Sequence, residues 1–415
     1  MSDPHCPFAA LSPQNPDGLL ALIAMHRADP RPGKIDLGVG IYRDADGRTP
    51  VMRAVKAAEA RLLAEQPTKA YLGSEGDPRY AELIAELLLG PGADDPRRFC
   101  LQTPGGTGAL RLGAELIARM APQARVWIGD PTWPNHGPIF SAARLVPIAH
   151  AFFDRATGTI AFDAMMAALA DARAGDVLLL HGGCHNPTGT QFSPDQWRAL
   201  AQFCIARGLL PFIDLAYQGL GDGLDEDAGG VRLMVDAVPG AMIAYSCDKN
   251  FGLYRERVGA LWIQAATPIT ADLARANLLT LARILWSMPP DHGAAVVRII
   301  LDDAALAQDW RAELTTMRAR LNAVRGSLAA AHPALAAIAG QRGMFSLLPV
   351  GPDAVARLRQ EHGIHMAGSG RINIAGLSPA NLPRFTDALA ACLPGDGAPR
   401  QDAPPRTTIC EDMER

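Results

Sequence analysis

The chain has 415 residues, of which 48% are hydrophobic and 20% are charged, a composition typical of a globular protein with a sizeable core. Its formal net charge is only −4, and the sequence has no basic run or basic–aromatic stripe, which argues against nucleic acid or a membrane surface as a partner. No apolar stretch approaches the roughly 20 residues that cross a bilayer. With no signal-peptide pattern and seven scattered cysteines without a CxxC pair, we expect a cytoplasmic protein with free thiols.

A glycine-rich stretch at 103–108, which is predicted to be a loop, is the first element in chain order with a chemical signature. It precedes an amphipathic stretch at 109–120 that is predicted to be a helix. Glycines let the backbone approach an anion, and a helix N-terminus offers free N–H groups. Gly105, Gly106 and Thr107 therefore form a candidate phosphate site, although a plain glycine turn before a helix explains the stretch about equally well.

Short apolar runs farther along the chain are typical of buried strands. Their continuous apolar character favours a mainly parallel sheet that is covered on both faces. The runs are 125–129, 177–181, 209–214, 241–245 and 259–263.

A helix is predicted between the second and third of these strands. Ser193 and Gln196 form the pattern of a capping box, with Pro194 at the first helical position and Gly208 as the stop. Strand–helix–strand repetition of this kind predicts a right-handed, doubly wound α/β domain. Ligands of such domains bind just beyond the carboxyl ends of the strands.

The pattern changes after about residue 300. A long helical stretch at 303–331 is followed by strand-like pieces at 344–348 and 371–375 and by a terminal helix, which predicts a second, smaller α+β domain. The tail is rich in Pro, Gly, Asp and Arg and is expected to be disordered. We expect four parts: an N-terminal segment packing with the small domain (1–49), a large domain (50–310), the small domain (311–393) and the tail (394–415).

Polar residues stand at the ends of two predicted strands. Asp214 ends one strand at a place where a carboxylate could meet a ring nitrogen, and His181 ends another. Asn186, in the turn after His181, could donate a hydrogen bond from a fixed position, or the turn could be loop chemistry alone. Taken one at a time, such residues are more often structural than catalytic.

The chain contains only four lysines, Lys34, Lys56, Lys69 and Lys249. Lys249 lies just beyond a predicted strand end, in the expected ligand zone, whereas the other three fall in polar turns or in a helix-like surface pattern. An amine that is buried near other cations loses proton affinity and becomes a usable nucleophile. Most lysines are solvated surface charges, but its position makes Lys249 the candidate nucleophile.

Six motifs in fixed order make residues 13–393 resemble the aspartate aminotransferase family of class I, fold type I pyridoxal-5′-phosphate (PLP) enzymes, with the bacterial aspartate and aromatic amino-acid aminotransferases as the nearest branch. The resemblance implies a large, doubly wound, mostly parallel seven-stranded sheet plus a smaller α+β domain built from the N- and C-terminal segments. The motifs are Thr-Pro-Gly-Gly-Thr-Gly-Ala-Leu-Arg, Pro-Thr-Trp-Pro-Asn-His, His-Asn-Pro-Thr-Gly, Asp-Leu-Ala-Tyr-Gln-Gly, Lys-Asn-Phe-Gly-Leu-Tyr and Gly-Arg-Ile-Asn-Ile-Ala-Gly.

The resemblance implies a role for each matching residue. Lys249 would hold PLP as an imine and later move the proton, and Asp214 would keep the pyridine nitrogen protonated so that the ring withdraws electrons. Asn186 and Tyr217 would hydrogen-bond the phenolic oxygen. The remaining cofactor contacts would come from Trp133 stacked on the ring, His136 and His181 in support of Asp214, Gly105, Gly106, Thr107, Ser246 and Arg257 at the phosphate, and Tyr71 from a second subunit.

Two arginines would set the substrate type. Arg371 matches the family residue that grips the substrate α-carboxylate with a bidentate fork. Arg283 matches the residue that crosses the interface of a homodimer with shared active sites to hold a side-chain carboxylate; the alternative is a structural interface arginine. The full set of substrate-binding residues would be Gly40, Trp133, Asn186, Arg283, Phe345 and Arg371.

The chain departs from the family pattern at several positions. Asp248 replaces the usual Ser two residues after Ser246, and because an anion beside a phosphate is unfavourable, we expect Asp248 to turn away or to pair with Arg255. Ala70 replaces the usual Asn before Tyr71. Trp286 and Met288 replace the usual Tyr and Asn near Arg283, which makes the substrate mouth more apolar and hints at aromatic as well as dicarboxylic substrates.

These observations predict an aminotransferase that moves the amino group of an aromatic amino acid or aspartate to 2-oxoglutarate, alternating between PLP and pyridoxamine phosphate. A strict aspartate aminotransferase is the alternative. A PLP-dependent lyase or decarboxylase is disfavoured, because Arg283 and Arg371 imply that two carboxylates are gripped and none is lost. A PLP-sensing regulator is disfavoured because no DNA-binding pattern is present. We expect no metal site.

Overall fold

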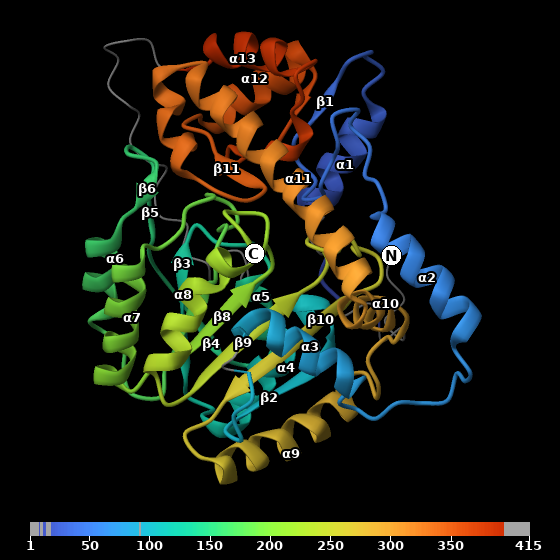
Figure 1. Ribbon diagram of the computed structural model, residues 1–415. Coiled ribbons are helices and arrows are strands. Elements are labelled where there is room, and N and C mark those ends of the chain that lie inside the picture. Colours follow the sequence, from blue (N-terminus) through green and yellow to red (C-terminus); the bar gives the residue numbers. More distant parts are fainter. Residues whose placement is uncertain (1–7, 9–10, 14–17, 91–92, 394–415) are drawn as a thin grey trace.

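A seven-stranded sheet forms the centre of the larger layer of the molecule (Figure 1). The computed structural model describes residues 8, 11–13, 18–90 and 93–393, so the tail expected at 394–415 lies outside the described residues. β10 runs antiparallel to both of its neighbours and the other paired strands are parallel, which confirms the predicted mostly parallel sheet. The order is β2 (Arg98–Pro104), β10 (Val258–Gln264), β9 (Ala241–Ser246), β8 (Leu210–Leu215), β7 (Val177–His181), β3 (Arg125–Asp130) and β4 (Val146–Ala151).

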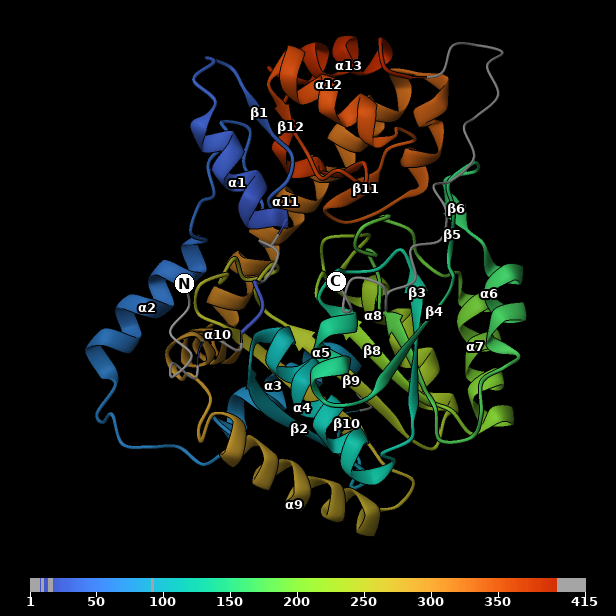
Figure 2. The same cartoon turned by 180° about the vertical axis from the view of Figure 1, so that it is seen from behind.

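The sheet is apolar on both faces because alternate residues of each strand enter different cores. In β7, Val177 and Leu179 join one cluster, whereas Leu178 and Leu180 join the other. Burying both faces explains why the strands appear as unbroken apolar runs in the sequence. One face is covered by α4 (Gly105–Met120), α5 (His136–Ala142) and α9 (Pro268–Leu285), and the other by α3 (Pro78–Leu89), α7 (Pro194–Arg207), α8 (Leu224–Ala237) and α10 (His292–Asp302) (Figures 1 and 2).

The capping residues of α7 are those that the sequence predicts. The Ser193 side chain accepts a hydrogen bond from the Gln196 backbone N–H, and the Gln196 side chain accepts one from the Ser193 backbone N–H. Gly208 ends the helix with a φ of +65°, in the left-handed region where glycine has no steric penalty.

Ser193→Ala is expected to lower the free energy of unfolding by about 1 kcal/mol, because it removes a hydrogen-bond acceptor from the first turn of the helix. Denaturant titration of the two proteins measures the difference. The catalytic rate should not change, and a loss of more than about 3 kcal/mol would show that Ser193 does more than cap the helix.

The start of α4 differs from the prediction. We expected a loop at 103–108, but β2 ends at Pro104 and the helix begins at Gly105, so the glycines lie in its first turn. Gly105 has a φ of +71°, which glycine adopts without strain. Glycine has low intrinsic helix propensity, and this made the first helical turn resemble a loop.

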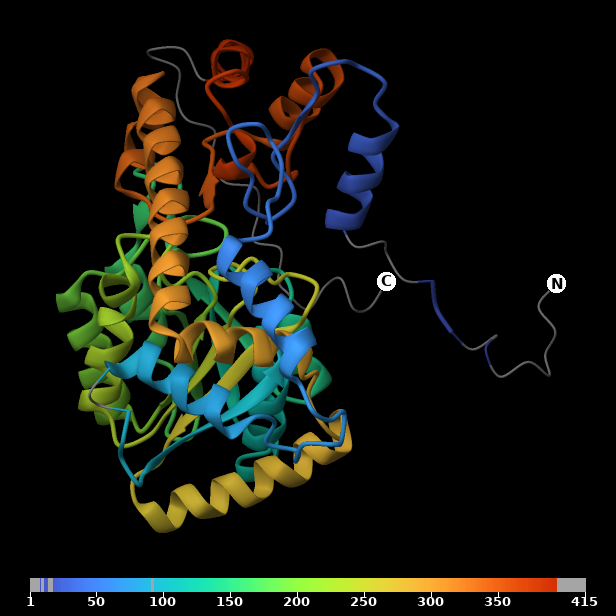
Figure 3. The ribbon, with the colours of Figure 1, turned by 45° about the vertical axis from the view of Figure 1, so that its right-hand side comes forward.

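A long helix connects this layer to a smaller group of elements. α11 (Ala304–Ala330) rises from the sheet layer into that group (Figure 3), close to the helix predicted at 303–331. There β11 (Phe345–Leu347) pairs with β13 (Arg371–Asn373) in antiparallel fashion. β1 (Ile35–Asp36), from the N-terminal part of the chain, pairs in parallel with β12 (Ile364–His365). The domain limits expected at 49, 310 and 393 remain predictions.

The other elements are short or peripheral. They are α1 (Gly18–Ala28), α2 (Arg53–Glu65), β5 (Phe153–Asp154), β6 (Thr159–Ile160), α6 (Phe162–Leu169), the 3-10 helices η3 (Pro333–Gly340) and η4 (Ile374–Gly376), α12 (Pro352–His362) and α13 (Leu382–Ala390). Among the described residues, no helix combines the length and the apolar character that a membrane span requires. The five cysteines in the same residues are free thiols.

Candidate active site

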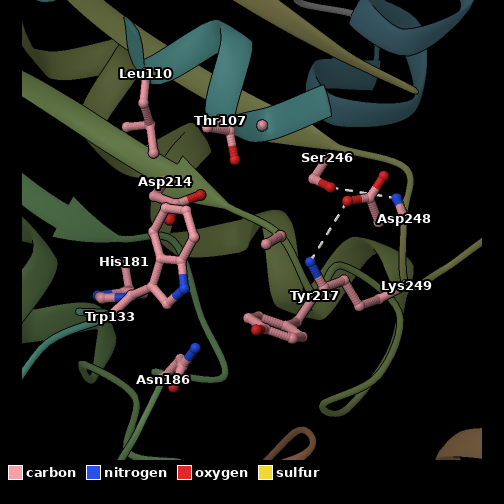
Figure 4. Close-up of a pocket in the computed structure, with 12 residues that line it drawn as sticks. Thr107, Leu110, Trp133, His181, Asn186, Asp214, Tyr217, Ser246, Asp248 and Lys249 are labelled. Carbon is pink, nitrogen blue, oxygen red and sulfur yellow. Dashed lines mark hydrogen bonds and ion pairs between the residues drawn. The ribbon is translucent and has the colours of Figure 1, made fainter. Parts of the chain in front are cut away.

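The carboxyl ends of four neighbouring strands and the first turns of α4 surround a pocket of about 440 Å³, counted with its open mouth (Figure 4). Of its lining residues, all but Leu110, Ala216 and Asp248 were candidates from the sequence. The lining consists of Gly106, Thr107, Leu110, Trp133, His181, Asn186, Asp214, Ala216, Tyr217, Ser246, Asp248 and Lys249.

Asp214 provides a buried carboxylate at one end of the pocket. It lies one residue before the end of β8, and the Nε2 atom of His136 donates to its Oδ2 atom at 3.0 Å. His136 is held in turn by Thr132, whose Oγ1 atom lies 2.8 Å from Nδ1. Burial alone raises the pKa of Asp214, but the hydrogen bond from His136 and nearby positive charges bring it below the ordinary value. Asp214 is therefore ionised at neutral pH.

His181 faces Asp214 from the neighbouring strand, because the two residues are in register across β7 and β8. Burial, with a smaller effect from His136, lowers the pKa of His181 to about 3. Its ring centroid lies 5.1 Å from that of His136 and 4.0 Å from that of His185. The Nε2 atom of His181 is buried and has no partner among the described residues. His181 is therefore a neutral imidazole that can accept or donate one more hydrogen bond.

Among the described residues, Lys249 is the only lysine that lines the pocket. Its Nζ atom lies 3.8 Å from Asp248 Oδ2 and 5.5 Å from the centroid of the Tyr217 ring. Burial lowers the pKa of Lys249, although Asp248 and Asp214 partly oppose this effect. More of this amine is therefore neutral than for an exposed lysine. Lys56 and Lys69 are exposed, and Lys34 donates to backbone carbonyls far from the pocket in the sequence.

Arg371 and its neighbours form a second cluster beside the pocket. The Nη1 atom of Arg371 donates to Asn186 Oδ1 at 3.4 Å, and Nη2 donates to the Gly38 carbonyl at 2.9 Å. Its guanidinium lies 4.8 Å from the centroid of the buried Phe345 ring. A Cβ atom at Gly40 would come within 2.9 Å of Phe345 Cζ, so Gly40 keeps room for that ring. The Nε atom of Arg371 is buried and has no partner in the described part of the chain, which leaves the guanidinium able to bind an anion.

The opposite end of the pocket carries groups that suit a phosphate. Gly106 and Thr107 lie in the first turn of α4, and Ser246 ends β9. A Cβ atom at Gly106 would lie 3.1 Å from Ser246 Cβ, and one at Gly105 would lie 2.5 Å from Arg257 Nη2. The glycines therefore allow the serine and the arginine to reach the helix N-terminus, where free N–H groups attract anions.

Asp248 does not behave as the sequence predicted. We expected it to turn away from this end or to pair with Arg255, but its buried side chain lines the pocket and accepts a hydrogen bond from Arg257 Nη1 at 2.7 Å. Arg255 is exposed. The fold decides between the two arginines: Arg257 has a φ of +56°, and its guanidinium lies against the start of α4 beside the pocket.

Tyr71 and Arg283 lie outside this pocket, on one exposed surface of the same chain. The Tyr71 side chain is 94% exposed, and the next residue, Leu72, donates its N–H to the Met288 sulfur at 3.0 Å. Arg283 Nη1 donates to Ser287 Oγ at 3.1 Å, and Ser74 Oγ donates to the Ser287 carbonyl. The two predicted site residues therefore lie in adjoining segments.

The pocket fits a flat, phosphorylated pyridine with an aldehyde group. The start of α4 with Arg257 suits the phosphate, the Asp214 carboxylate suits a protonated ring nitrogen, and the Lys249 amine suits the carbonyl. The model for the family described as aminotransferase class I and II matches residues 32–389. The chain belongs to this family.

Individual relatives agree with the family assignment. A tyrosine aminotransferase of Rhizobium meliloti is 53% identical over 90% of this chain and 97% of its own length. An aspartate aminotransferase of Salmonella typhi is 44% identical over 91% of this chain and 98% of its own. A crystal structure of an aromatic-amino-acid aminotransferase from Burkholderia pseudomallei, covalently bound to pyridoxal phosphate, is 37% identical with a TM-score of 0.90 and covers 93% of this chain and 99% of its own. The cofactor of this aminotransferase is pyridoxal 5′-phosphate, as predicted.

Proposed function

We propose that the chain is an aminotransferase that takes its amino group from aromatic amino acids or aspartate and passes it to 2-oxoglutarate. The observation that carries this proposal is the meeting of the Lys249 amine and the Asp214 carboxylate in one pocket. The relatives support the proposal, because one is named a tyrosine aminotransferase and another an aspartate aminotransferase. A strict aspartate aminotransferase is the alternative.

The groups of the pocket divide the chemistry between them. When bound, pyridoxal phosphate supplies a carbonyl and a cationic ring that withdraws electrons from the substrate Cα. Lys249 would hold the cofactor covalently through its Nζ atom, and the same atom would take the proton from the substrate Cα. Asp214, oriented by His136, keeps the proton on the ring nitrogen. Because burial of Lys249 lowers its pKa, a larger share of this amine is neutral and able to act as a base than of an exposed lysine.

The remaining residues orient the cofactor. Tyr217 and Asn186 would hold the phenolic oxygen of the cofactor, and burial raises the pKa of Tyr217, so its hydroxyl stays a donor at neutral pH. Trp133 would pack against the ring, and His181 would support Asp214. The phosphate would be held by Gly105, Gly106, Thr107, Ser246 and Arg257. The group His136, His181 and Asp214 has ligand atoms within 4.8 Å of one another, and we assign it to the ring nitrogen and not to a metal.

Arg371 binds the substrate α-carboxylate. Its guanidinium lies beside Asn186. The Phe345 ring packs against the guanidinium, and Gly40 leaves space for the Phe345 ring. Burial of Arg371 costs solvation, which an incoming carboxylate restores through charge-assisted hydrogen bonds. Trp133 and Asn186 complete the substrate contacts.

A homodimer with shared active sites accounts for Tyr71 and Arg283. Both belong to the exposed surface formed by the adjoining segments 71–74 and 283–288. In the proposed dimer this surface meets the partner's pocket, where Tyr71 reaches the phosphate and Arg283 binds a side-chain carboxylate. The neighbouring Trp286 and Met288 make this end of the site suitable for an aromatic side chain as well. Localisation in the cytoplasm stays a prediction.

Arg283→Ala is expected to reduce kcat/KM for aspartate and glutamate about 10²-fold or more and to change the value for phenylalanine by less than about threefold. Each charge-assisted hydrogen bond contributes roughly 1.5–3 kcal/mol, and only the dicarboxylic substrates make the pair. Steady-state kinetics measure kcat/KM for aspartate, phenylalanine and tyrosine as donors. The acceptor, 2-oxoglutarate, is kept at a saturating concentration.

Arg275→Ala is the matched control, because Arg275 is exposed on the same helix two turns earlier. This variant should leave kcat/KM unchanged for all three amino-group donors. If Arg283→Ala lowers kcat/KM equally for aspartate and phenylalanine, Arg283 does not select the side chain.

A further inference from the structure

Asp248 is a buried anion at the end of the pocket that is assigned to the phosphate. Its side chain is 8% exposed and lines the pocket together with Gly106, Thr107 and Ser246. Its backbone N–H donates to Ser246 Oγ at 3.2 Å, so Asp248 and the serine share one turn after β9. Figure 4 shows the carboxylate between Ser246 and the Lys249 amine. Any anion that enters this end therefore meets a carboxylate.

The Asp248 carboxylate already forms an ion pair with Arg257, a cation of this site. Oδ2 of Asp248 accepts from Arg257 Nη1 at 2.7 Å and lies 3.8 Å from Lys249 Nζ. Its other oxygen, Oδ1, is buried and has no partner among the described residues. A buried acceptor without a donor is unfavourable, so the carboxylate gains from every cation and donor that it can keep.

Asp248 therefore lowers the net positive charge at the phosphate end. Apart from the Lys249 amine, Arg257 contributes one positive charge and the N-terminus of α4 the equivalent of about half a charge, while Asp248 subtracts one. An uncharged side chain at position 248 would leave the full charge of Arg257 to the phosphate. Charges a few ångströms apart at a partly buried site interact strongly enough to change an equilibrium constant by more than tenfold.

Arg257 faces Asp248 and the phosphate end with different atoms. Its backbone has a φ of +56°, which non-glycine residues rarely adopt, and its Nη1 atom also donates to the Tyr254 carbonyl at 3.1 Å. Its Nη2 atom lies against Gly105, at the start of α4. Asp248 thus holds the Nη1 side, the Nη2 side faces the phosphate end, and the carboxylate acts on a bound phosphate through its charge.

We propose that Asp248 weakens the binding of the phosphorylated cofactor, because its carboxylate offsets the positive charge of Arg257 and repels the cofactor phosphate. This inference rests on the proposed function and assigns a cofactor-affinity role to a residue that the family pattern does not predict. The effect is largest for pyridoxamine 5′-phosphate, the form without a covalent bond to Lys249. In this form the phosphate and ring contacts hold the cofactor without a covalent bond.

The test compares the affinities of two ligands that differ only in the phosphate. Full-length protein freed of cofactor is titrated with pyridoxamine 5′-phosphate and with pyridoxamine, and quenching of tryptophan fluorescence gives each Kd. The proteins are the wild type, Asp248→Asn and Asp248→Ser. The ratio of the pyridoxamine Kd to the pyridoxamine phosphate Kd isolates the contribution of the phosphate.

The ratio is expected to be at least about tenfold larger in both variants than in the wild type, with the pyridoxamine Kd unchanged. Asp195→Asn is the control for net charge, because Asp195 is 93% exposed at the start of α7, and it should leave the ratio unchanged. Equal ratios in the wild type and both variants would overturn the proposal. If no protein binds pyridoxamine phosphate at all, the proposed function fails as well.

A double-mutant cycle with Arg257→Ala separates the charge of Asp248 from a merely structural role in holding Arg257. Arg257→Ala should lower the ratio about tenfold or more, because it removes a cation from the phosphate end. In the Arg257→Ala background, Asp248→Asn should still raise the ratio by more than about threefold, because the carboxylate that repels the phosphate is gone. No effect of Asp248→Asn in that background would show that Asp248 acts only by holding Arg257 and would contradict the proposal.

Discussion

Lys249→Ala is expected to reduce turnover at least about 10⁴-fold, because one side chain provides both the covalent attachment of the cofactor and the base at the substrate Cα. Cofactor binding should weaken but persist, since the phosphate and ring contacts come from other residues. Single-turnover kinetics with aspartate and with phenylalanine measure the chemical step, and equilibrium dialysis measures the bound cofactor.

Lys56→Ala provides the matched control. The Lys56 side chain is 66% exposed and forms an ion pair with Glu59 on α2, so its removal should leave turnover unchanged. A Lys249→Ala enzyme that retains more than about one hundredth of wild-type turnover would mean that another group acts as the base.

Asp214→Asn is expected to reduce kcat about 10²- to 10³-fold without preventing cofactor binding. The amide has the shape of the carboxylate but no charge, so it cannot hold a proton on the ring nitrogen. Without that charge the ring withdraws electrons less strongly, and removal of the Cα proton becomes slower. Because the pKa of Asp214 lies below the ordinary value, the wild-type carboxylate stays ionised throughout the neutral range, and its own titration should not appear in the pH profile there.

Asp176→Asn distinguishes a catalytic from a structural carboxylate. Asp176 is also buried, but it lies just before the start of β7, at the far end of the strands from the pocket, and pairs with Arg125 at 2.6 Å. This variant should lose stability in thermal unfolding and keep kcat, whereas Asp214→Asn should lose kcat with a smaller change in Tm. Equal kcat values for Asp214→Asn and the wild type would remove Asp214 from the mechanism.

Much of the sheet could be predicted because both faces of each strand are buried. β7 was predicted with its observed limits, 177–181, since burial on both sides produces a run without polar residues. The same logic located the pocket: Asp214, Ser246 and Lys249 lie at or just beyond strand ends, and parallel strands bring their carboxyl ends to one edge.

Other features depend on tertiary contacts that no local pattern contains. Leu110 and Ala216 line the pocket, but an apolar residue near a strand or helix end has no chemical signature. Arg255 and Arg257 are almost equally distant from Asp248 in sequence, and only the path of the chain past α4 selects Arg257 as its partner. Thr132 supports His136 through a contact that its four-residue spacing could have suggested.

The attachment of the cofactor to Lys249 is the claim on which the mechanism depends, and peptide mapping after borohydride reduction tests it most directly. Reduction makes the bond between the lysine and pyridoxal phosphate permanent, and mass spectrometry then locates the modified residue among the four lysines. We predict one modified site, Lys249, which disappears when glutamate is added before the reduction. Modification of Lys34, Lys56 or Lys69 in its place, or of none of the four, would contradict the mechanism.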